Sequence, residues 1–398
     1  MTKLRIKNFG PIGKGATDSK DGFIDISNLT LFVGSQGAGK STVAKLFSSL
    51  CWVEKAVLVG KKTTKEVETL TFLKNLLSYQ RIESFLKDES EVEYISDFIH
   101  ITLSHKKLSI KTKNAEKYIR PQIQYLPSER NLVGIVDRFA QLPLLPDSMQ
   151  GFLYVYDEVI NSPEVQNSVL PIENLSVHYN KRKNKVELQS ERYTVSLNEA
   201  ASGFQSAVPL FLVTKYFIDT IKKRRVELKF KNVNEQKEFE KVLDKNKAFN
   251  SYFVNIVEEP EQNLFPNSQK NIIQFLLSSL NEDGQNKLIL TTHSPYILET
   301  INNSIYAARL QEEGFKADAL VREQEQIDYD KVSAYVVKNG EIHSIKADDI
   351  MQIDPKEIDG CSEEINTVYS KLSEMEFSDG KYEWQRLEEN LFPAHCCF

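Results

Sequence analysis

The chain contains few cysteines, and their spacing excludes several kinds of site. The four are Cys51, Cys361, Cys396 and Cys397, in a sequence of 398 residues. None has the spacing of a zinc-ligand pair, and the adjacent C-terminal pair is not a redox CxxC motif. Because cysteine usage does not indicate an oxidising compartment, we expect a reducing, cytoplasmic setting.

Long apolar runs and repeats are also missing. No segment is apolar for long enough to cross a bilayer, so we expect no membrane partner. The opening residues MTKLRIKNFG lack the apolar core of a signal peptide, so we expect no export signal. No heptad pattern is sustained, which excludes a long coiled coil.

An excess of basic residues is the third absence. The formal net charge is −6 and the pI about 5.7, so the electrostatics of the whole chain do not favour nucleic acid. Basic clusters do occur at Lys106–Lys107, Lys181–Lys183 and Lys222–Arg225. Such runs are usually solvated faces, but they would bind nucleic acid if the fold brought them together. Nucleic acid therefore stays open as a partner.

The most informative stretch is LFVGSQGAGKSTVAKLF, residues 31–47, where an apolar strand leads through a GxxxxGK[ST] turn into a helix. Backbone N–H groups in such a turn wrap phosphate oxygens, and the helix N-terminus favours anions. Lys40 would reach the β- and γ-phosphates, and Ser41 would hold Mg²⁺. We predict a P-loop for ATP and Mg²⁺. The predicted binding residues are Gly34, Ser35, Gln36, Gly37, Ala38, Gly39, Lys40, Ser41 and Thr42.

A second apolar strand, FVNIVEE at residues 253–259, ends in two acids. This is the arrangement of a Walker B strand, in which one carboxylate lies on the metal side and the next activates water. Glu258 is the predicted Mg²⁺ ligand, although an aspartate is more usual there. Its extra methylene favours contact with the ion through water. Glu259 is the predicted general base, and an acidic strand exit without chemistry is the alternative.

A third apolar strand is followed by TTHSP, residues 291–295. A histidine at the carboxyl end of a strand can donate a hydrogen bond to a γ-phosphate. A lone histidine is more often structural, but the position of His293 after the next strand favours function. Lys40, Glu259 and His293 are therefore the predicted catalytic residues.

The segment ASGFQ, residues 201–205, begins a long apolar helix and resembles the ABC signature with Phe in place of its second glycine. Ser202 and the Gly203 amide at a helix N-terminus can bind a γ-phosphate, and we include Gln205 in this set. The alternative is an ordinary serine N-cap. Within one chain, the signature segment cannot easily reach a γ-phosphate bound at the P-loop. The pattern therefore predicts a homodimer or higher oligomer of head-to-tail heads.

The P-loop, YLPSERN, ASGFQS, VEEPEQNLFP and TTHSP occur in an order that resembles the ABC-type ATPases of the RecF/SMC and OLD group. The stand-alone AAA-family ATPases of bacterial anti-phage systems, such as the Septu ATPase and retron-associated relatives, are the most similar. The resemblance spans about residues 1–300, and the tail segment beginning AYVVKNGEIHSI is also similar. It implies a D-loop at the dimer interface, near Asn263 and Pro266.

The resemblance also implies a Q-loop, and its residue stays open. The alternatives are Gln122, Gln124, Ser128, Glu129 and Arg130.

The chain departs from the OLD nucleases in its tail of about 100 residues. Asp348 and Asp349 lack the arrangement and flanking glycines of a Toprim metal site. We therefore expect the nuclease or toxin effector to be a separate chain.

We predict an α/β P-loop NTPase fold, an ABC-ATPase head with a mixed β-sheet core, an antiparallel β subdomain and helical insertions. The head would cover residues 1–300, with insertions at about 53–120 and 222–250 as places for partner docking. Residues 301–398 would form a strand and helix extension packed on the head.

The predicted function is an ATPase that converts ATP and water to ADP and phosphate and drives or gates a partner effector in prokaryotic anti-phage defence. The alternative is a RecF-like DNA-repair clamp, which requires a convergent basic groove across the dimer. A third reading is a nucleotide-gated assembly with little turnover. Glu259→Gln separates this reading from an active ATPase, in which it would stop turnover and prolong the ATP-bound dimer.

Overall fold

The computed structural model describes residues 2–135, 145–229, 250–356 and 367–374, with the backbone alone over 225–229. The chain divides into two compact units, Met1–Asp354 and Pro355–Phe398. In the second unit, residues 367–374 are helical. Most of the predicted insertion at 222–250 and three of the four cysteines lie outside the described residues. The domain division at residue 300 stays a prediction.

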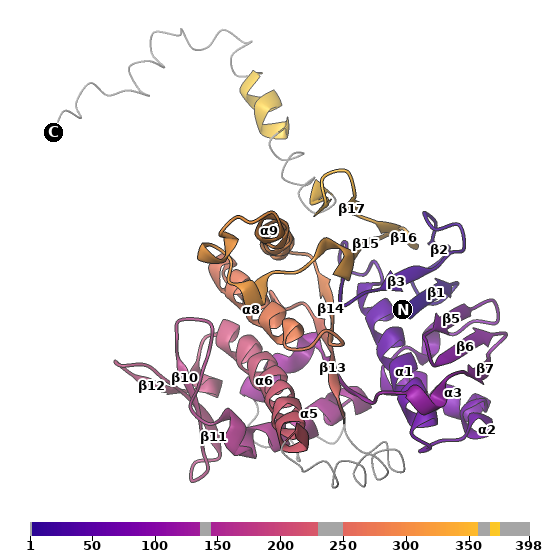
Figure 1. Cartoon of the computed structure of the whole chain (residues 1–398), viewed down its shortest axis with the longest axis horizontal. Coiled ribbons are helices and arrows are strands. Elements are labelled where there is room, and N and C mark those ends of the chain that lie inside the picture. The colour runs from indigo at the N-terminus through magenta and orange to yellow at the C-terminus, as the bar shows by residue number, and fades with distance from the viewer. Residues whose placement is uncertain (1, 136–144, 230–249, 357–366, 375–398) are drawn as a thin grey trace. The chain divides into compact units, whose positions relative to one another are not determined.

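A seven-stranded mixed sheet forms the centre of the first unit (Figure 1), in the order β2-β16-β15-β4-β14-β13-β8. Its strands are β2 Gly15–Ala16, β16 Glu341–Ser344, β15 Val332–Lys338, β4 Leu29–Val33, β14 Lys287–Thr292, β13 Tyr252–Glu258 and β8 Pro121–Leu126. The five strands from β15 to β8 are parallel, and β16 runs antiparallel to β15. Their continuous apolar sequences follow from burial on both faces.

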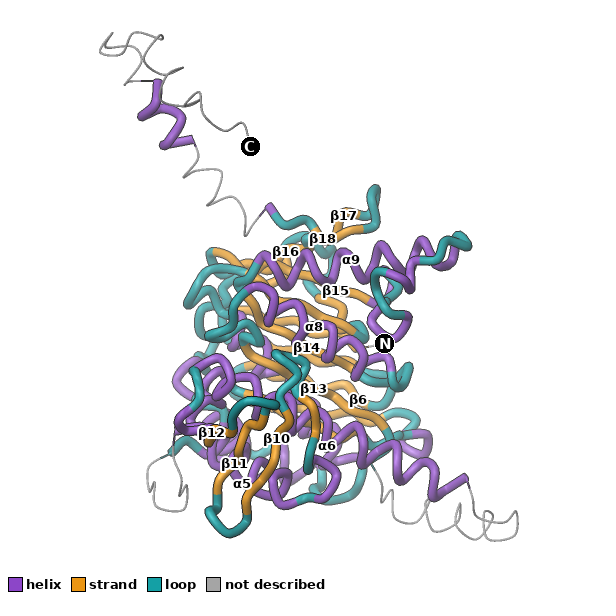
Figure 2. Tube along the Cα trace, turned by 90° about the vertical axis from the view of Figure 1, so that its left-hand side faces the viewer, coloured by secondary structure: helices purple, strands orange, loops and turns teal. Residues whose placement is uncertain are grey.

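Helices cover both faces of this sheet. The helices are α1 Lys40–Leu58, α2 Thr64–Val67, α3 Leu70–Tyr79, α4 Leu132–Ile135, α5 Asp147–Asn161, α6 Ser202–Lys229, α8 Pro266–Asn281 and α9 Pro295–Glu312. In Figure 1, α1 lies on one side of β13 and β14, and α6 and α8 lie on the other. Figure 2 shows α8 and α9 side by side along the sheet.

Two antiparallel sheets flank this core. One has the order β3-β1-β5-β6-β7, and the other β12-β11-β10-β9. The strands of the first are β1 Thr2–Lys7, β3 Ile24–Ile26, β5 Glu91–Ile95, β6 Ile99–Ser104 and β7 Lys107–Thr112. Those of the second are β9 Ser168–Val169, β10 Ser176–Asn180, β11 Lys185–Gln189 and β12 Thr194–Ser196, and β17 Lys346–Ala347 pairs with β18 Gln352–Ile353. The predicted mixed-sheet core, antiparallel subdomain and helical segments are confirmed.

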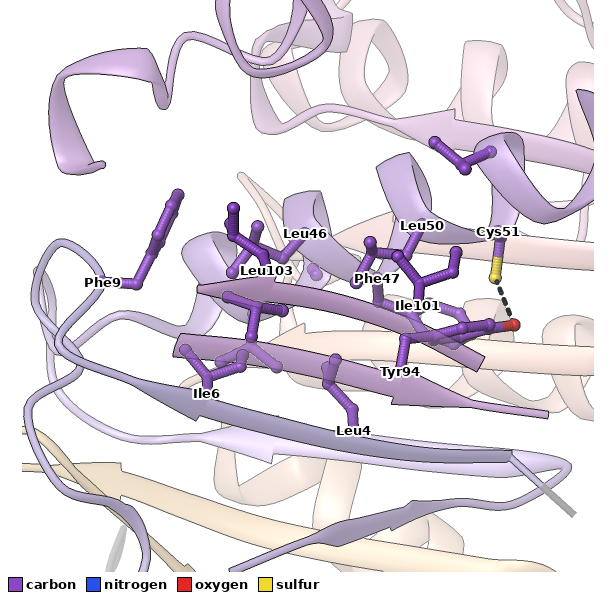
Figure 3. Packing of buried hydrophobic residues seen from close by; sticks show 14 of the residues in the cluster. Leu4, Ile6, Phe9, Leu46, Phe47, Leu50, Cys51, Tyr94, Ile101 and Leu103 are labelled. Carbon is purple, nitrogen blue, oxygen red and sulfur yellow. Dashed lines mark hydrogen bonds between the residues drawn. The ribbon is translucent and has the colours of Figure 1, made fainter. Parts of the chain in front are cut away.

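The first antiparallel sheet packs against α1 (Figure 3). Leu4 and Ile6 alternate with outward-facing residues along β1, and they are at most 2% exposed. Across the interface, Phe47 and Leu50 of α1 complete the cluster. Burial raises the pKa of the Cys51 thiol, so this cysteine is a packing residue and not a reactive one.

The predicted insertion at about 53–120 contains both helices and strands. α3 ends at Tyr79, shortly before Arg81 takes a left-handed φ of 59°. The first strand after these helices is β5, whose alternation EVEYI is short and acidic. Pairing with β1 stabilises β5, and such pairing is not visible in local sequence.

Candidate nucleotide site

The predicted motifs meet at one edge of the central sheet because the strands that carry them are parallel neighbours. Val33 at the end of β4 lies opposite Thr292 of β14, and Glu258 of β13 lies opposite Thr291. β8 ends beside β13, with Leu126 opposite Val257. The P-loop, the histidine turn, the acidic turn and the YLPSERN turn therefore all begin at this carboxyl edge, where open α/β sheets bind ligands.

Glycine is required at two positions of the P-loop. Gly34 has φ 140°, and a Cβ there would lie 2.3 Å from the carbonyl oxygen of Val337 on β15. Gly39 has φ 116°, and its Cβ would lie 2.7 Å from the side chain of Ile12. A side chain at Gly34 would displace backbone of β15, whereas one at Gly39 would meet the end of the Ile12 side chain and be disfavoured mainly by its positive φ.

Lys40 begins α1 and is 6% exposed. Its Nζ donates to the carbonyl oxygens of Gly34 and Ser35, at 2.7 and 2.9 Å. Burial lowers the pKa of Lys40, and the nearby carboxylates of Glu258 and Glu259 act in the opposite direction. The predicted lysine and the two predicted acids therefore lie close enough to interact electrostatically.

Glu258 and Ser41 have the chemistry to hold Mg²⁺. Glu258 is 2% exposed, its Oε2 accepts from the Ser128 amide at 3.3 Å, and its Oε1 makes no regular hydrogen bond, although the Tyr125 hydroxyl lies next to the carboxylate. A buried carboxylate with so few donors fits a cation. Among the described residues, no group of three His, Cys, Asp or Glu side chains is placed around a metal.

Glu259 occupies a left-handed backbone conformation with φ 43°, which costs a non-glycine residue about 1–2 kcal/mol. Two contacts hold it there. Its N–H donates to the Thr291 carbonyl at 2.9 Å, and its carbonyl oxygen accepts from Arg130 Nη2 at 2.7 Å. Strained backbone held on both sides is typical of functional positions.

Arg130 is fully buried and connects three segments of the site. Its guanidinium donates to the carbonyl oxygens of Glu258 at 2.6 Å, Ser206 at 3.0 Å and Pro127 at 3.1 Å, in addition to Glu259. Burial lowers its pKa to about 10, so it stays charged at neutral pH. The side chain joins the ends of β8 and β13 to the first turns of α6.

Glu261, which is not among the predicted site residues, holds the histidine turn. Its Oε1 accepts from Thr292 Oγ1 and from the His293 amide, both at 2.8 Å, and lies 3.3 Å from His293 Nδ1. Glu261 is 5% exposed, whereas the His293 side chain is 57% exposed. The sequence signal was a third acid two residues after the pair at 258–259, beyond Pro260.

The signature segment lies beside the acidic turn of the same chain. Ser202 is exposed in the first turn of α6, where the Phe204 and Gln205 amides donate to the Ala201 carbonyl. A Cβ on Gly203 would lie 2.8 Å from the Asn263 carbonyl oxygen, so glycine allows this close packing. The Gln205 side-chain amide donates to the Ala200 carbonyl at 3.1 Å and is used within the chain.

The Q-loop alternatives separate in the structure. Gln122 and Gln124 lie within β8, and the Gln124 amide donates to the Tyr125 carbonyl at 3.0 Å. Ser128 and Arg130 lie at the carboxyl edge, where both contact Glu258. The assignment of a Q-loop residue stays open.

The three basic clusters belong to different elements, and each has a lysine paired with an acid. Lys106, in the turn between β6 and β7, pairs with Asp88. Lys183, in the turn between β10 and β11, pairs with Glu187. Lys223 on α6 pairs with Glu164. Figure 1 draws β6 and β10 on opposite sides of the first unit, so these two clusters do not form one patch within a single chain.

Comparison with known proteins gives one family match. Residues 154–298 match the AAA ATPase domain family, a stretch that contains the signature segment, β13 and β14. No curated protein matches the chain. Within the described residues, no helix is both long and apolar enough to span a membrane.

Several solved structures are similar at low sequence identity. The SMC head domain from Thermotoga maritima is 12% identical, over 86% of this chain and 97% of that one, with a TM-score of 0.39. An Smc head domain from Pyrococcus furiosus, bound to the C-terminal domain of ScpA, is 11% identical over 87% and 96%, also at 0.39. A dimeric ATP-binding cassette bound to ADP and Pi is 11% identical over 86% and 96%, at 0.33.

TM-scores below 0.5 reflect only partial agreement of the traces, so the assignment depends on the family match and the geometry. The P-loop between β4 and α1, the parallel strand order and the family match together support an ATP-binding P-loop ATPase.

Proposed function

We propose that the chain hydrolyses ATP at a site completed by a second copy of itself, and that this cycle drives or gates a partner effector. The observation that supports the proposal most strongly is the meeting of Lys40, Glu258 and Glu259 at one sheet edge. The Lys40 ammonium is bonded to two P-loop carbonyls and lies within electrostatic reach of both carboxylates, and Glu259 stands on a strained turn.

In this proposal, the P-loop amides and Lys40 hold the triphosphate. Glu259 accepts a proton from the attacking water, and His293 donates a hydrogen bond to the γ-phosphate as charge develops there. Mg²⁺, held by Ser41 and Glu258, would neutralise phosphate charge. Glu261 fixes the backbone beside His293, so it acts as a positioning residue.

The proposed dimer would be head-to-tail. Ser202 is exposed at the start of α6, where the helix N-terminus favours an anion. The partner's γ-phosphate is the anion that we assign to this end. Phe265 and Tyr296, 78% and 50% exposed, flank the acidic and histidine turns. Exposed aromatic side chains beside the site support coverage by another protein surface.

The test is ATP turnover and mass, measured on the purified protein with and without ATP. Lys40→Ala should abolish turnover and ATP-dependent assembly. Glu259→Gln should abolish turnover but accumulate the ATP-bound dimer. Glu299→Gln, an exposed acid on α9, is the matched control and should match the wild type. Turnover retained in Glu259→Gln, or the absence of any ATP-dependent dimer, would contradict the proposal.

The proposed biology is prokaryotic anti-phage defence in the cytoplasm, with a separate nuclease or toxin as the effector. The proposal is supported by the order and the residues of the five motifs, from the P-loop to TTHSP. The test is phage plaque formation on bacteria that express the chain with its genomic neighbours, compared between the wild type and Lys40→Ala. Equal plaque counts in the two strains would contradict the defence role.

A RecF-like DNA clamp is the less favoured alternative, because a lysine in each basic cluster is already paired with an acid. A salt-dependent, ATP-dependent affinity for duplex DNA would reverse this order.

A further inference from the structure

Gln269 is a polar residue on the buried face of α8. It is 9% exposed, and the buried positions that follow it at helical spacing are apolar: Ile272, Ile273 and Leu276. The helical period therefore favours an apolar side chain at residue 269. Burying an amide is unfavourable unless its donor and acceptor atoms are paired, so a glutamine here needs partners. Figure 2 shows α8 beside α9, the helix that starts directly after the histidine turn.

Both ends of the Gln269 amide have partners, and these partners belong to different turns. Nε2 donates to the Leu264 carbonyl oxygen at 2.9 Å, at the end of the acidic turn. Oε1 accepts from Ser294 Oγ at 2.5 Å, in the histidine turn. Ser294 is 5% exposed, so this contact is shielded from water. One side chain thus connects the turn after β13 to the turn after β14.

Further hydrogen bonds close this connection into a ring. The Ser294 amide donates to Thr292 Oγ1 at 3.0 Å, and Thr292 Oγ1 donates to Glu261 Oε1 at 2.8 Å. The Leu264 amide donates to the Glu261 carbonyl oxygen at 2.9 Å, and the Leu264 carbonyl returns the ring to Gln269. Connected networks of buried hydrogen bonds make the segments that they join rigid. The acidic turn and the histidine turn are therefore held at one fixed separation.

Two proposed catalytic residues extend from the turns that this ring joins. The His293 amide donates to Glu261 Oε1 at 2.8 Å, and the Glu259 amide donates to the Thr291 carbonyl oxygen at 2.9 Å. Both backbones are fixed, while the His293 side chain is 57% exposed. Catalytic groups must be held to within about 0.5 Å of their working positions, so the separation of the two turns matters for the reaction.

We propose that Gln269 is a positioning residue for ATP hydrolysis, which holds the turns of Glu259 and His293 at the separation that one γ-phosphate requires. The role rests on the proposed function, because it acts on the base and the histidine assigned there. Gln269 acts through these residues, since both ends of its buried amide are bonded inside the protein. Its loss should lower kcat and leave the KM for ATP almost unchanged, because the P-loop is untouched.

The test compares Gln269→Leu with Gln274→Leu, a matched control on the same helix. The Gln274 amide donates to the buried Glu325 carboxylate at 3.1 Å, outside both turns. Both variants should lower the melting temperature by a similar amount, since each leaves a buried group without its donor. Gln269→Leu should also lower kcat by about tenfold or more, with KM within about twofold, because a small misplacement of catalytic groups is enough for such a loss. Gln274→Leu should keep the wild-type kcat and KM.

Ser294→Ala removes the partner of Gln269 Oε1, so the two residues form a double-mutant cycle. If they act through their shared hydrogen bond, the double variant should have the kcat of Gln269→Leu alone, and not the product of the two losses.

Amide hydrogen exchange gives a second readout, which needs no ATP. In Gln269→Leu, the His293 and Ser294 amides should exchange about tenfold faster than in the wild type, because local opening of the histidine turn becomes easier. In Gln274→Leu, these amides should exchange at the wild-type rate.

If the wild type does not hydrolyse ATP, the proposed function fails and the role of Gln269 fails with it. If the wild type hydrolyses ATP and Gln269→Leu keeps its kcat, the role alone is overturned. Equal losses of kcat in Gln269→Leu and Gln274→Leu would also overturn it, because they would reflect a weakened α8 and not the separation of the two turns. Wild-type exchange of the His293 and Ser294 amides in Gln269→Leu would show that Gln269 does not hold the histidine turn.

Discussion

Replacing Arg130 with methionine should destabilise the protein strongly, because its guanidinium donates to four backbone carbonyl oxygens inside the fold. Each carbonyl left without a donor costs about 1–3 kcal/mol, and relief of the buried charge offsets part of that cost. We expect a net loss of about 3–5 kcal/mol. At the usual unfolding entropy per residue, this corresponds to a drop of about 4–7 °C in melting temperature.

The assay is thermal unfolding combined with steady-state ATP turnover. Arg130 joins the Glu259 carbonyl to α6, so its loss should also misplace the proposed base relative to the signature helix. We expect kcat to fall by about 10²-fold with KM little changed, since P-loop binding is left in place. Arg224→Met, at an exposed position on α6, is the control.

Arg130→Lys separates geometry from charge. A lysine keeps the charge, but its ammonium cannot reach carbonyls on three segments as a planar guanidinium does. This variant should resemble Arg130→Met. A melting temperature within about 1 °C of the wild type for either variant would refute the reasoning. It would mean that buried carbonyl groups can lose their hydrogen-bond donors at little cost in stability.

Three further perturbations follow from the contacts. Glu261→Ala should lower the free energy of unfolding by about 2–3 kcal/mol, measured in urea, because two donors in the histidine turn lose their acceptor. It should also lower ATP turnover, measured by phosphate release. Unchanged turnover would exclude a positioning role. Glu54→Gln should raise the melting temperature at pH 8, with the gain shrinking toward pH 4.5. Burial raises the pKa of Glu54, so the folded state favours the protonated carboxyl. The stability that the protonated carboxyl contributes therefore declines as pH rises above 4.5, the ordinary pKa of a glutamate. A difference in melting temperature between variant and wild type that does not depend on pH would contradict this. Gly34→Ala should prevent folding or ATP binding, because its Cβ would meet a carbonyl oxygen at 2.3 Å. Gly37→Ala, with nothing within 4 Å, should cost only about 1 kcal/mol, and equal melting temperatures for the two would be inconsistent with the P-loop packing.

The sequence was sufficient for motifs whose chemistry is local. A P-loop is a strand, a turn and a helix in continuous sequence, and its buried strand and first helix occur where predicted. The strands before Glu258 and His293 were also visible as apolar runs. Their parallel pairing explains why the two residues share one edge.

Contacts between distant segments could not be predicted. Arg130 donates to carbonyls 76 and 128 residues away, and nothing near it in sequence indicates either partner. Glu261 meets His293 across 32 residues for the same reason. β5 is short and acidic on one face, so its sequence signal was weak without knowledge of its neighbour β1.

The most direct test of the central claim is complementation between two inactive variants. Lys40→Ala lacks a working P-loop, and Ser202→Arg blocks the signature, so neither should hydrolyse ATP alone. In a head-to-tail heterodimer, one site combines two intact halves. An equal mixture should therefore recover turnover, up to about half of the wild-type value if every dimer is mixed, because each mixed dimer has one complete site out of two. Turnover that stays at the level of the separate variants at every mixing ratio would contradict a site shared between two chains.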